Sequence, residues 1–164
     1  MEQKDISSLA NIVGSYVLTS LDILGQHIQL PTNVSSLRVS KENIAFAATQ
    51  LQNKKVKFSV STADHLECSF EENQVDFDNS ITIPKSVAEA LPTKVGIYFF
   101  AFRNDDMFQP RDPDAEVESI IISATVNGIK MKNLKNPIEI VFEKKSEDAE
   151  VVCKYWKIGE QFVL

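Results

Sequence analysis

Few side chains in this sequence are of the types that carry out catalysis or bind metals. The 164 residues include two cysteines and two histidines. His65 and Cys68 share a His-x-x-Cys spacing that can supply one corner of a zinc site, but such a site needs about four ligands and no second cluster follows. We therefore expect no bound metal, with His65 on the surface and Cys68 in a strand.

Two further kinds of binding site are also disfavoured. The five glycines never recur at the GxGxxG or GxxxxGK spacing of phosphate-binding loops, so no nucleotide cofactor is expected. One loop gathers carboxylates of the kind that calcium prefers, but it lacks the EF-hand spacing, and a solvated acidic turn is the favoured interpretation. Its members are Asp105, Asp106, Asp112 and Asp114. The sequence thus predicts no catalytic, metal-binding or cofactor-binding residues.

Composition and charge limit the kinds of partner. Lysine plus arginine number 17 and aspartate plus glutamate 23, which gives a net charge of −6. This balance argues against nucleic acid and against an anionic membrane surface as main partners. No apolar run approaches the roughly 18 residues that a transmembrane helix needs, and the polar N-terminus has no signal-peptide core behind it. We expect a soluble chain that does not insert into a membrane, either cytosolic or a piece of a longer exported protein.

Spacing of apolar residues predicts one long helix over residues 5–29. Its apolar residues recur at intervals of three and four, which places them on one stripe of a helix. They are Ile6, Leu9, Val13, Tyr16, Val17, Leu21, Leu24 and Ile28. We expect this stripe to pack on a core, and Gly25 followed by Pro31 marks the region where the helix stops.

From residue 34 onward the apolar pattern has a period of two, which is typical of strands. Strands are predicted around 44–48, 56–60, 66–70, 75–77, 81–83, 95–102, 117–126, 138–142 and 151–156. The segment 95–102 is apolar on both faces and should be a central strand. Pro84 and Pro92 flank a short helix over 84–91. The fold expected is therefore mainly β, an antiparallel β-sandwich with an N-terminal amphipathic helix and one short internal helix.

Five strings in the second half of the chain resemble motifs of one known family. They are Ser80–Val87, Gly96–Phe108, Ile121–Gly128, Asn133–Ile140 and Cys153–Trp156. In this order they resemble the GAIN domain, the autoproteolysis-inducing domain of adhesion G-protein-coupled receptors and polycystin-like proteins. The last string looks like the C-x-aromatic-W opening of the GPS motif, so Cys153, Tyr155 and Trp156 would be GPS-like structural residues. The resemblance implies a helical segment over 1–33, the shortened end of the family's helical subdomain, and a GAIN-B-like sandwich over 34–164.

The GPS-like segment 153–164 departs from the family pattern because it is truncated. After Trp156 come eight residues without a second Trp, further cysteines or the His-Leu-Ser/Thr cleavage tripeptide. Self-cleavage needs a hydroxyl or thiol nucleophile, and the near match His65-Leu66-Glu67 has Glu in that place. The peptide agonist that follows the cleavage site in the receptors is missing as well.

The resemblance implies a non-enzymatic extracellular scaffold or interaction module on the outer face of the plasma membrane, as part of a longer protein. Its partners would be a protein ligand or the remainder of a receptor chain. Two alternatives stay open: an unrelated soluble β-sandwich binding module, and a self-cleaving domain that is missing its C-terminus.

Three local expectations complete the prediction. In the family the GPS cysteine bridges to a later cysteine that is absent here, and a Cys68–Cys153 pair requires Cα atoms within about 7 Å, which the sequence leaves open. Asn33 begins an Asn-Val-Ser glycosylation sequon. Trp156 should be buried with residues 161–164 extended, and Trp156→Ala should then cost about 3–5 kcal/mol.

Overall fold

A computed structural model describes residues 3–155 except 32, 52–53, 71–76, 93–94, 104–106, 109–113, 128, 130, 132, 147, 149 and 154. Along them lie α1 (Gln3–His27), β1 (Ser36–Ser40), β2 (Ile44–Gln50), β3 (Val56–Ser61), β4 (Glu67–Ser69), β5 (Asn79–Ile83), α2 (Lys85–Glu89), β6 (Gly96–Phe102), β7 (Ile121–Val126) and β8 (Glu139–Val141).

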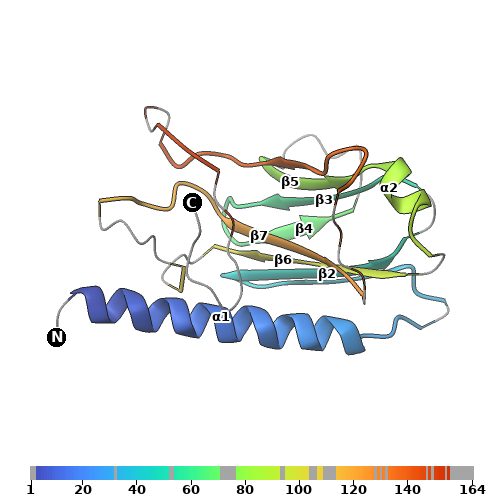
Figure 1. Ribbon diagram of the computed structural model, residues 1–164, viewed down its shortest axis with the longest axis horizontal. Helices are drawn as coiled ribbons and strands as arrows, with labels where there is room; N and C mark the ends of the chain where they lie inside the picture. The colour runs from blue at the N-terminus through green and yellow to red at the C-terminus, as the bar shows by residue number, and fades with distance from the viewer. Residues whose placement is uncertain are drawn as a thin grey trace.

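The strands form two four-stranded sheets in which every neighbouring pair is antiparallel. The helix-side sheet has the order β1-β2-β6-β7, and the far sheet has the order β4-β3-β5-β8. Figure 1 shows the two sheets stacked as layers, with α1 running along the outer side of the helix-side sheet. The predicted antiparallel β-sandwich with an N-terminal helix and a short internal helix is therefore confirmed.

The core between the two sheets is built by side chains that alternate along the strands. In β6 the inward residues Ile97, Phe99 and Ala101 are fully buried. The ring of Phe99 stacks on that of Phe58 in β3, with centroids 4.8 Å apart and 12° between the planes. Aromatic pairs of this kind stabilise a core beyond the area they bury. The period-two pattern in the sequence arises because every second residue of these strands points into this core.

The opposite face of β6 is also buried, because α1 covers it. Tyr98, Phe100 and Phe102 are at most 3% exposed, and Leu18 and Leu21 of α1 are among the residues that pack against them. A strand is apolar on both faces when both faces are covered. The prediction that this strand is central is therefore confirmed, and α1 is the element that covers its second face.

Two glycines let α1 approach the sheet closely. Gly14 and Gly25 are 11 residues apart, about three helical turns, so they lie on the same side of the helix. A Cβ atom on Gly14 would overlap the backbone oxygen of Met107, and one on Gly25 would overlap the ring of Tyr98. Gly25 thus lies inside α1 and serves packing, and the helix continues past it to His27.

The predicted core-facing stripe of α1 is only partly correct. Val17, Leu21 and Ile28 pack on the sheet, whereas four other members of the stripe face solvent. Those four are Leu9, Val13, Tyr16 and Leu24. The physical reason is that the buried side of α1 centres on small residues, the two glycines, which an apolar pattern does not register. Ile6 has a side chain outside the described part.

The strand assignments differ from prediction at both ends of the sandwich. β1 is not among the predicted strands, although its Leu37 and Val39 alternate with polar residues; both side chains are exposed, and β1 pairs with β2. A strand over 151–156 is wrong for the residues described there, 151–153 and 155, which have no strand partner. The segment 75–77 falls largely outside the described residues. The short helix is confirmed as α2.

Candidate functional site

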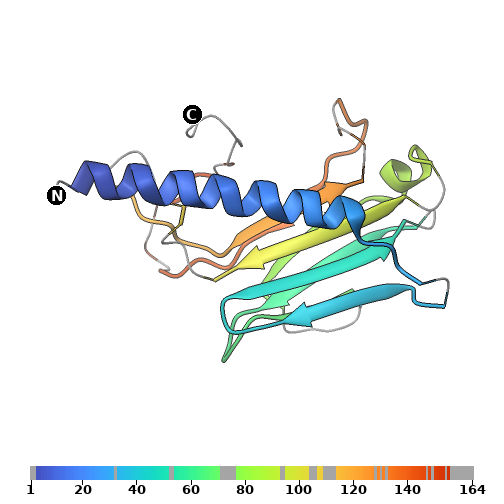
Figure 2. The same cartoon turned by 90° about the horizontal axis from the view of Figure 1, so that it is seen from below.

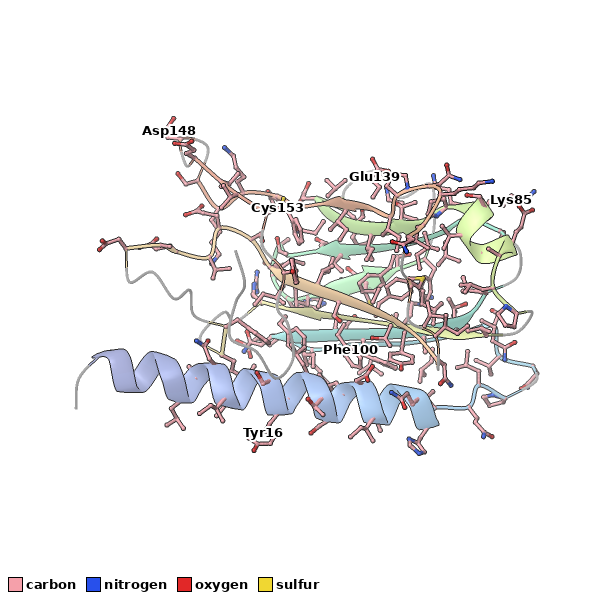
Figure 3. The ribbon with its side chains drawn as sticks, viewed as in Figure 1. Tyr16, Lys85, Phe100, Glu139, Asp148 and Cys153 are labelled. Carbon is pink, nitrogen blue, oxygen red and sulfur yellow. The ribbon has the colours of Figure 1, made fainter. Side chains whose placement is uncertain are left out.

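The GPS-like segment lies on the surface of the sandwich. Residues 151–153 and 155 form no regular structure, and Val152 and Tyr155 are 72% and 65% exposed. Cys153 is exposed as well, and Figure 3 places it on the opposite side of the molecule from α1. Trp156 and residues 161–164 lie outside the described residues, so the predictions of a buried Trp156 and an extended end remain predictions.

The chain reaches this surface from an anchored crossing between the sheets. In the far sheet, the buried Asn79 side chain accepts a hydrogen bond from the backbone N–H of Glu143, at 3.1 Å. Two residues on, the Lys145 N–H donates to the carbonyl of Glu118 at 2.8 Å, just before β7 of the helix-side sheet. The Ser146 N–H donates to the Glu118 carboxylate at 3.0 Å. Residues 143–146 are therefore held by Asn79 of β5 in the far sheet and by Glu118, which precedes β7 of the helix-side sheet.

Beside this crossing, β8 offers an exposed strand. It pairs with β5, Ile140 opposite Ile81, and forms the edge of the far sheet among the described residues. Ile140, Val141 and Phe142 are between 37% and 47% exposed. An edge strand with exposed apolar side chains is suited to contact with another segment of polypeptide.

The two cysteines are not brought together. Both thiols are free, Cys68 buried in β4 and Cys153 exposed. The Cys68 sulfur lies 3.6 Å from the Ser40 hydroxyl and 3.6 Å from the carbonyl oxygen of Phe46. Burial raises the pKa of the Cys68 thiol, so it stays protonated and unreactive at neutral pH. The disulfide that the sequence left open is not formed in this structure.

The sequon residue Asn33 is accessible. It is exposed in the connection between α1 and β1. The connection is held by the Thr49 hydroxyl, which donates to the Ser35 carbonyl at 2.9 Å. This placement fits glycan attachment, which remains a prediction.

The residues weighed for catalysis or metal binding are scattered. His65 is exposed, next to the fully buried Leu66. Across the described part of the chain no three His, Cys, Asp or Glu side chains gather in a way that could hold a metal ion. In the acidic loop only Asp114 is described. No described helix is long and apolar enough to cross a membrane.

Sequence reasoning did not identify Tyr98 as a polar link between helix and sheet. Its hydroxyl donates weakly to Asp22 of α1, 3.4 Å from the carbonyl oxygen and 3.5 Å from the carboxylate. Desolvation, with the nearby Asp22 charge, raises the pKa of Tyr98 to about 12. A shallow cleft of about 220 Å³ adjoins it, between the end of α1 and the first residues of β6. With its pKa raised away from neutrality, the Tyr98 phenol stays protonated at pH 7 and is a poor general base.

Arg103, at the end of β6, is a second residue that sequence reasoning missed. Its guanidinium group donates to the carbonyls of Ala63 and Asp64, at 2.8 and 3.0 Å, and also to that of Thr62. One arginine thereby joins the helix-side sheet to the β3–β4 turn of the far sheet. The planar fork of donors explains why Arg suits this position.

Comparison with known proteins agrees with this architecture. The family model for GPS, GAIN subdomain B, matches residues 26–161. The mouse adhesion G-protein coupled receptor G4 is 21% identical over 168 residues, covering 94% of this chain and 5% of the receptor. The structure of the full extracellular region of zebrafish Gpr126/Adgrg6 superimposes with a TM-score of 0.78 at 20% identity, covering 94% of this chain and 22% of that chain. The chain therefore spans only a small part of either relative.

Proposed function

Since this chain belongs to the GAIN subdomain B family, we propose that it is a non-enzymatic scaffold module on the extracellular side of an adhesion-receptor-like protein. The family match over residues 26–161 is the observation that carries the proposal. Support for an extracellular place comes from the two similar proteins, one named as an adhesion receptor and the other an extracellular region.

We also propose that the module does not cleave itself, because residues 1–164 contain no His-Leu-Ser or His-Leu-Thr tripeptide. The only near match to the cleavage tripeptide is His65-Leu66-Glu67. Its Leu66 is fully buried, and its third residue is a carboxylate where a hydroxyl or thiol would have to attack the preceding carbonyl. This segment therefore has no nucleophile for an acyl shift, and the chain should remain intact.

The scaffold role is supported by how the chain leaves the sandwich. Residues 143–146 are held by Asn79 of β5 and by Glu118, which precedes β7, and further along the chain Val151, Val152 and Tyr155 are exposed. Apolar groups on an anchored segment beside an edge strand are placed to contact another polypeptide. We assign this contact to the remainder of the receptor chain or to a protein ligand.

Secretion tests this proposal. Residues 1–164 would be produced behind a secretion signal in cultured mammalian cells, and the medium would be assayed by intact mass and by N-glycosidase treatment. We expect one unbroken chain that carries a glycan, which Asn33→Gln removes. The control Phe99→Asp, which places a charge in the aromatic core, should be retained in the cell. Two fragments, or retention of the unaltered chain, would contradict the proposal.

A chimera tests the receptor context. The aligned 94% of this chain would replace the matching segment of the mouse adhesion receptor G4. The proposal expects the chimera at the cell surface as a single full-length band. Loss from the surface while the isolated module is secreted normally would show that it does not serve as a receptor scaffold.

A further inference from the structure

A shallow cleft, which we call the α1–β6 cleft, lies between the end of α1 and the helix-side sheet. Its volume is about 220 Å³, and it is bounded by residues 28–30 after the helix, by the end of β2 and by the start of β6. In Figure 2 the chain leaves α1 and turns back into β1 at this end of the sheet. Pockets that enclose drug-sized ligands measure roughly 300–1,000 Å³. The α1–β6 cleft therefore suits a smaller group, such as a single sugar ring.

The lining of this cleft is neutral. Among the described residues that form it, none carries a charged side chain. The side-chain amides of Gln29, Gln50 and Asn127 lie at the cleft, and amides both donate and accept hydrogen bonds. Half-buried Leu30 adds an apolar contact. Such a lining suits an uncharged ligand with several hydroxyl or amide groups, and it offers no counter-charge to an ion.

Gly96, the first residue of β6, keeps the cleft open. It lies on the same face of the strand as Tyr98 and Phe100, because alternate residues of a strand share a face. A Cβ atom on Gly96 would have no contact within 4 Å beyond its chain neighbours. A glycine inside a strand often marks a place where a ligand approaches closely. The space beside Gly96 is therefore available to a group from outside the sandwich.

The glycosylation sequon is tied to both walls of this cleft. Asn33 lies in a turn, residues 31–34, that a backbone hydrogen bond of 2.9 Å closes. Leu30, just before the turn, lines the cleft. Just after the turn, the Ser35 carbonyl accepts a hydrogen bond at 2.9 Å from the hydroxyl of Thr49, which also lines the cleft. Three residues span at most about 10 Å, so exposed Asn33 lies within that distance of Leu30.

We propose that the α1–β6 cleft holds the first N-acetylglucosamine of a glycan attached to Asn33. The hydroxyl and acetamido groups of the sugar bond to the amides at the cleft, and its ring covers the open space beside Gly96. The contact fixes the segment after α1 against the sheet, so the glycan stabilises the junction between the helix and the sandwich. The inference rests on the proposed extracellular function, because such a glycan is added to secreted chains.

Thermal unfolding of the secreted chain tests the inference. The glycan would be trimmed enzymatically to a single N-acetylglucosamine. The comparison is Ser35→Ala, which removes the sequon but keeps Asn33 and the carbonyl that Thr49 binds. We expect the sugar to raise the midpoint of unfolding by about 2–4 °C, the shift that a contact worth about one hydrogen bond gives in a domain of this size. The amide NMR signals of Leu30 and Gly96 should also shift when the sugar is present.

Gly96→Val shows whether the sugar acts through the cleft. Valine suits a strand and fills the open space, so the variant should keep the fold but leave no room for the sugar. In this background the sugar should change the midpoint of unfolding by less than about 1 °C. The direct effect of Ser35→Ala is present in both backgrounds and cancels when the two differences are compared.

A glycan at a second exposed site is the matched control. Lys135→Thr creates a sequon at Asn133, in the connection between β7 and β8, where both residues are exposed. Combined with Ser35→Ala and trimmed in the same way, this second sugar should change the midpoint of unfolding by less than about 1 °C.

Three results would overturn the inference while the module is still secreted intact, as the proposed function requires. They are a glycan at Asn33 that leaves the midpoint unchanged, a gain that persists in Gly96→Val, and an equal gain from the sugar at Asn133. A chain that is secreted without a glycan at Asn33 would also overturn it.

Discussion

Gly25→Ala is the substitution for which helix propensity and tertiary packing predict opposite results. In a helix interior, Ala stabilises relative to Gly by about 0.5–1 kcal/mol, because Gly loses more backbone freedom on folding. From helix propensity alone, the change should therefore stabilise the protein. In the structure, however, a Cβ at this position would overlap the ring of Tyr98.

The size of the effect depends on whether that ring can move. Tyr98 is 2% exposed, packs edge-on against Phe100 with centroids 6.3 Å apart, and is linked to Asp22 through its hydroxyl. An added methyl group must therefore push α1 away from the sheet, and overpacking of this kind costs about 1–3 kcal/mol. After the gain in helix propensity is subtracted, we expect Gly25→Ala to lower the free energy of unfolding by about 1–2 kcal/mol.

Urea unfolding, followed by far-UV circular dichroism, measures this difference. In a Tyr98→Leu background the obstructing ring is gone, so Gly25→Ala should become neutral or stabilising by up to about 1 kcal/mol. Ser20→Ala, on the exposed side of α1, controls for helix propensity and should stabilise the protein by about 0.5 kcal/mol or less at low chain concentration. A Gly25→Ala protein more stable than the parent would refute the close packing of α1 on β6.

Three other perturbations test polar links and thiols. The pKa of Tyr98 in the folded state is raised to about 12. The protonated hydroxyl therefore contributes fully to the free energy of unfolding below about pH 10, and this stabilisation is lost as the pH rises toward 12. Tyr98→Phe should remove this loss of stability from the pH dependence of thermal unfolding. Arg103→Lys keeps the charge but loses the fork that binds three carbonyls, so urea unfolding should show a loss of about 1–2 kcal/mol, and an unchanged midpoint would contradict the cross-sheet link. With a thiol reagent, exposed Cys153 should react at once and buried Cys68 only after unfolding; two unreactive thiols would indicate the disulfide instead.

The sheets were predictable because strand burial leaves a local record. Where a strand lies between two covered layers, as β6 does, each residue must be apolar whichever way it points, and the run of apolar letters shows this directly. In β3 and β5 the apolar residues alternate and lie in the core, so a period-two pattern predicts these strands. Four of the five strings that carried the family resemblance coincide with β5 and α2, β6, β7 and β8.

The candidate site was less predictable, because it depends on contacts between distant segments. Nothing local to Arg103 shows that carbonyls 39 to 41 positions away will converge on its guanidinium group. Cys68 is likewise not bonded to Cys153, because the fold does not bring β4 next to the segment after β8 that carries Cys153. The surface position of Tyr155 is a third example, since a C-x-aromatic-W string is compatible with either a strand or a surface segment.

By itself, the sequence determined the class of fold, the existence and extent of the long helix, the central strand and the family resemblance. Each of these features can be predicted from the types of residues that lie close together in the sequence. Only the tertiary structure decided which side of α1 is buried. An apolar stripe identifies hydrophobic positions, but the helix turns toward the sheet the side on which Gly14 and Gly25 allow the closest approach. Close packing between a helix and a sheet depends on the shape of both surfaces, and the second surface is formed by Tyr98 and Met107, which are 73 and 93 positions further along the chain than Gly25 and Gly14.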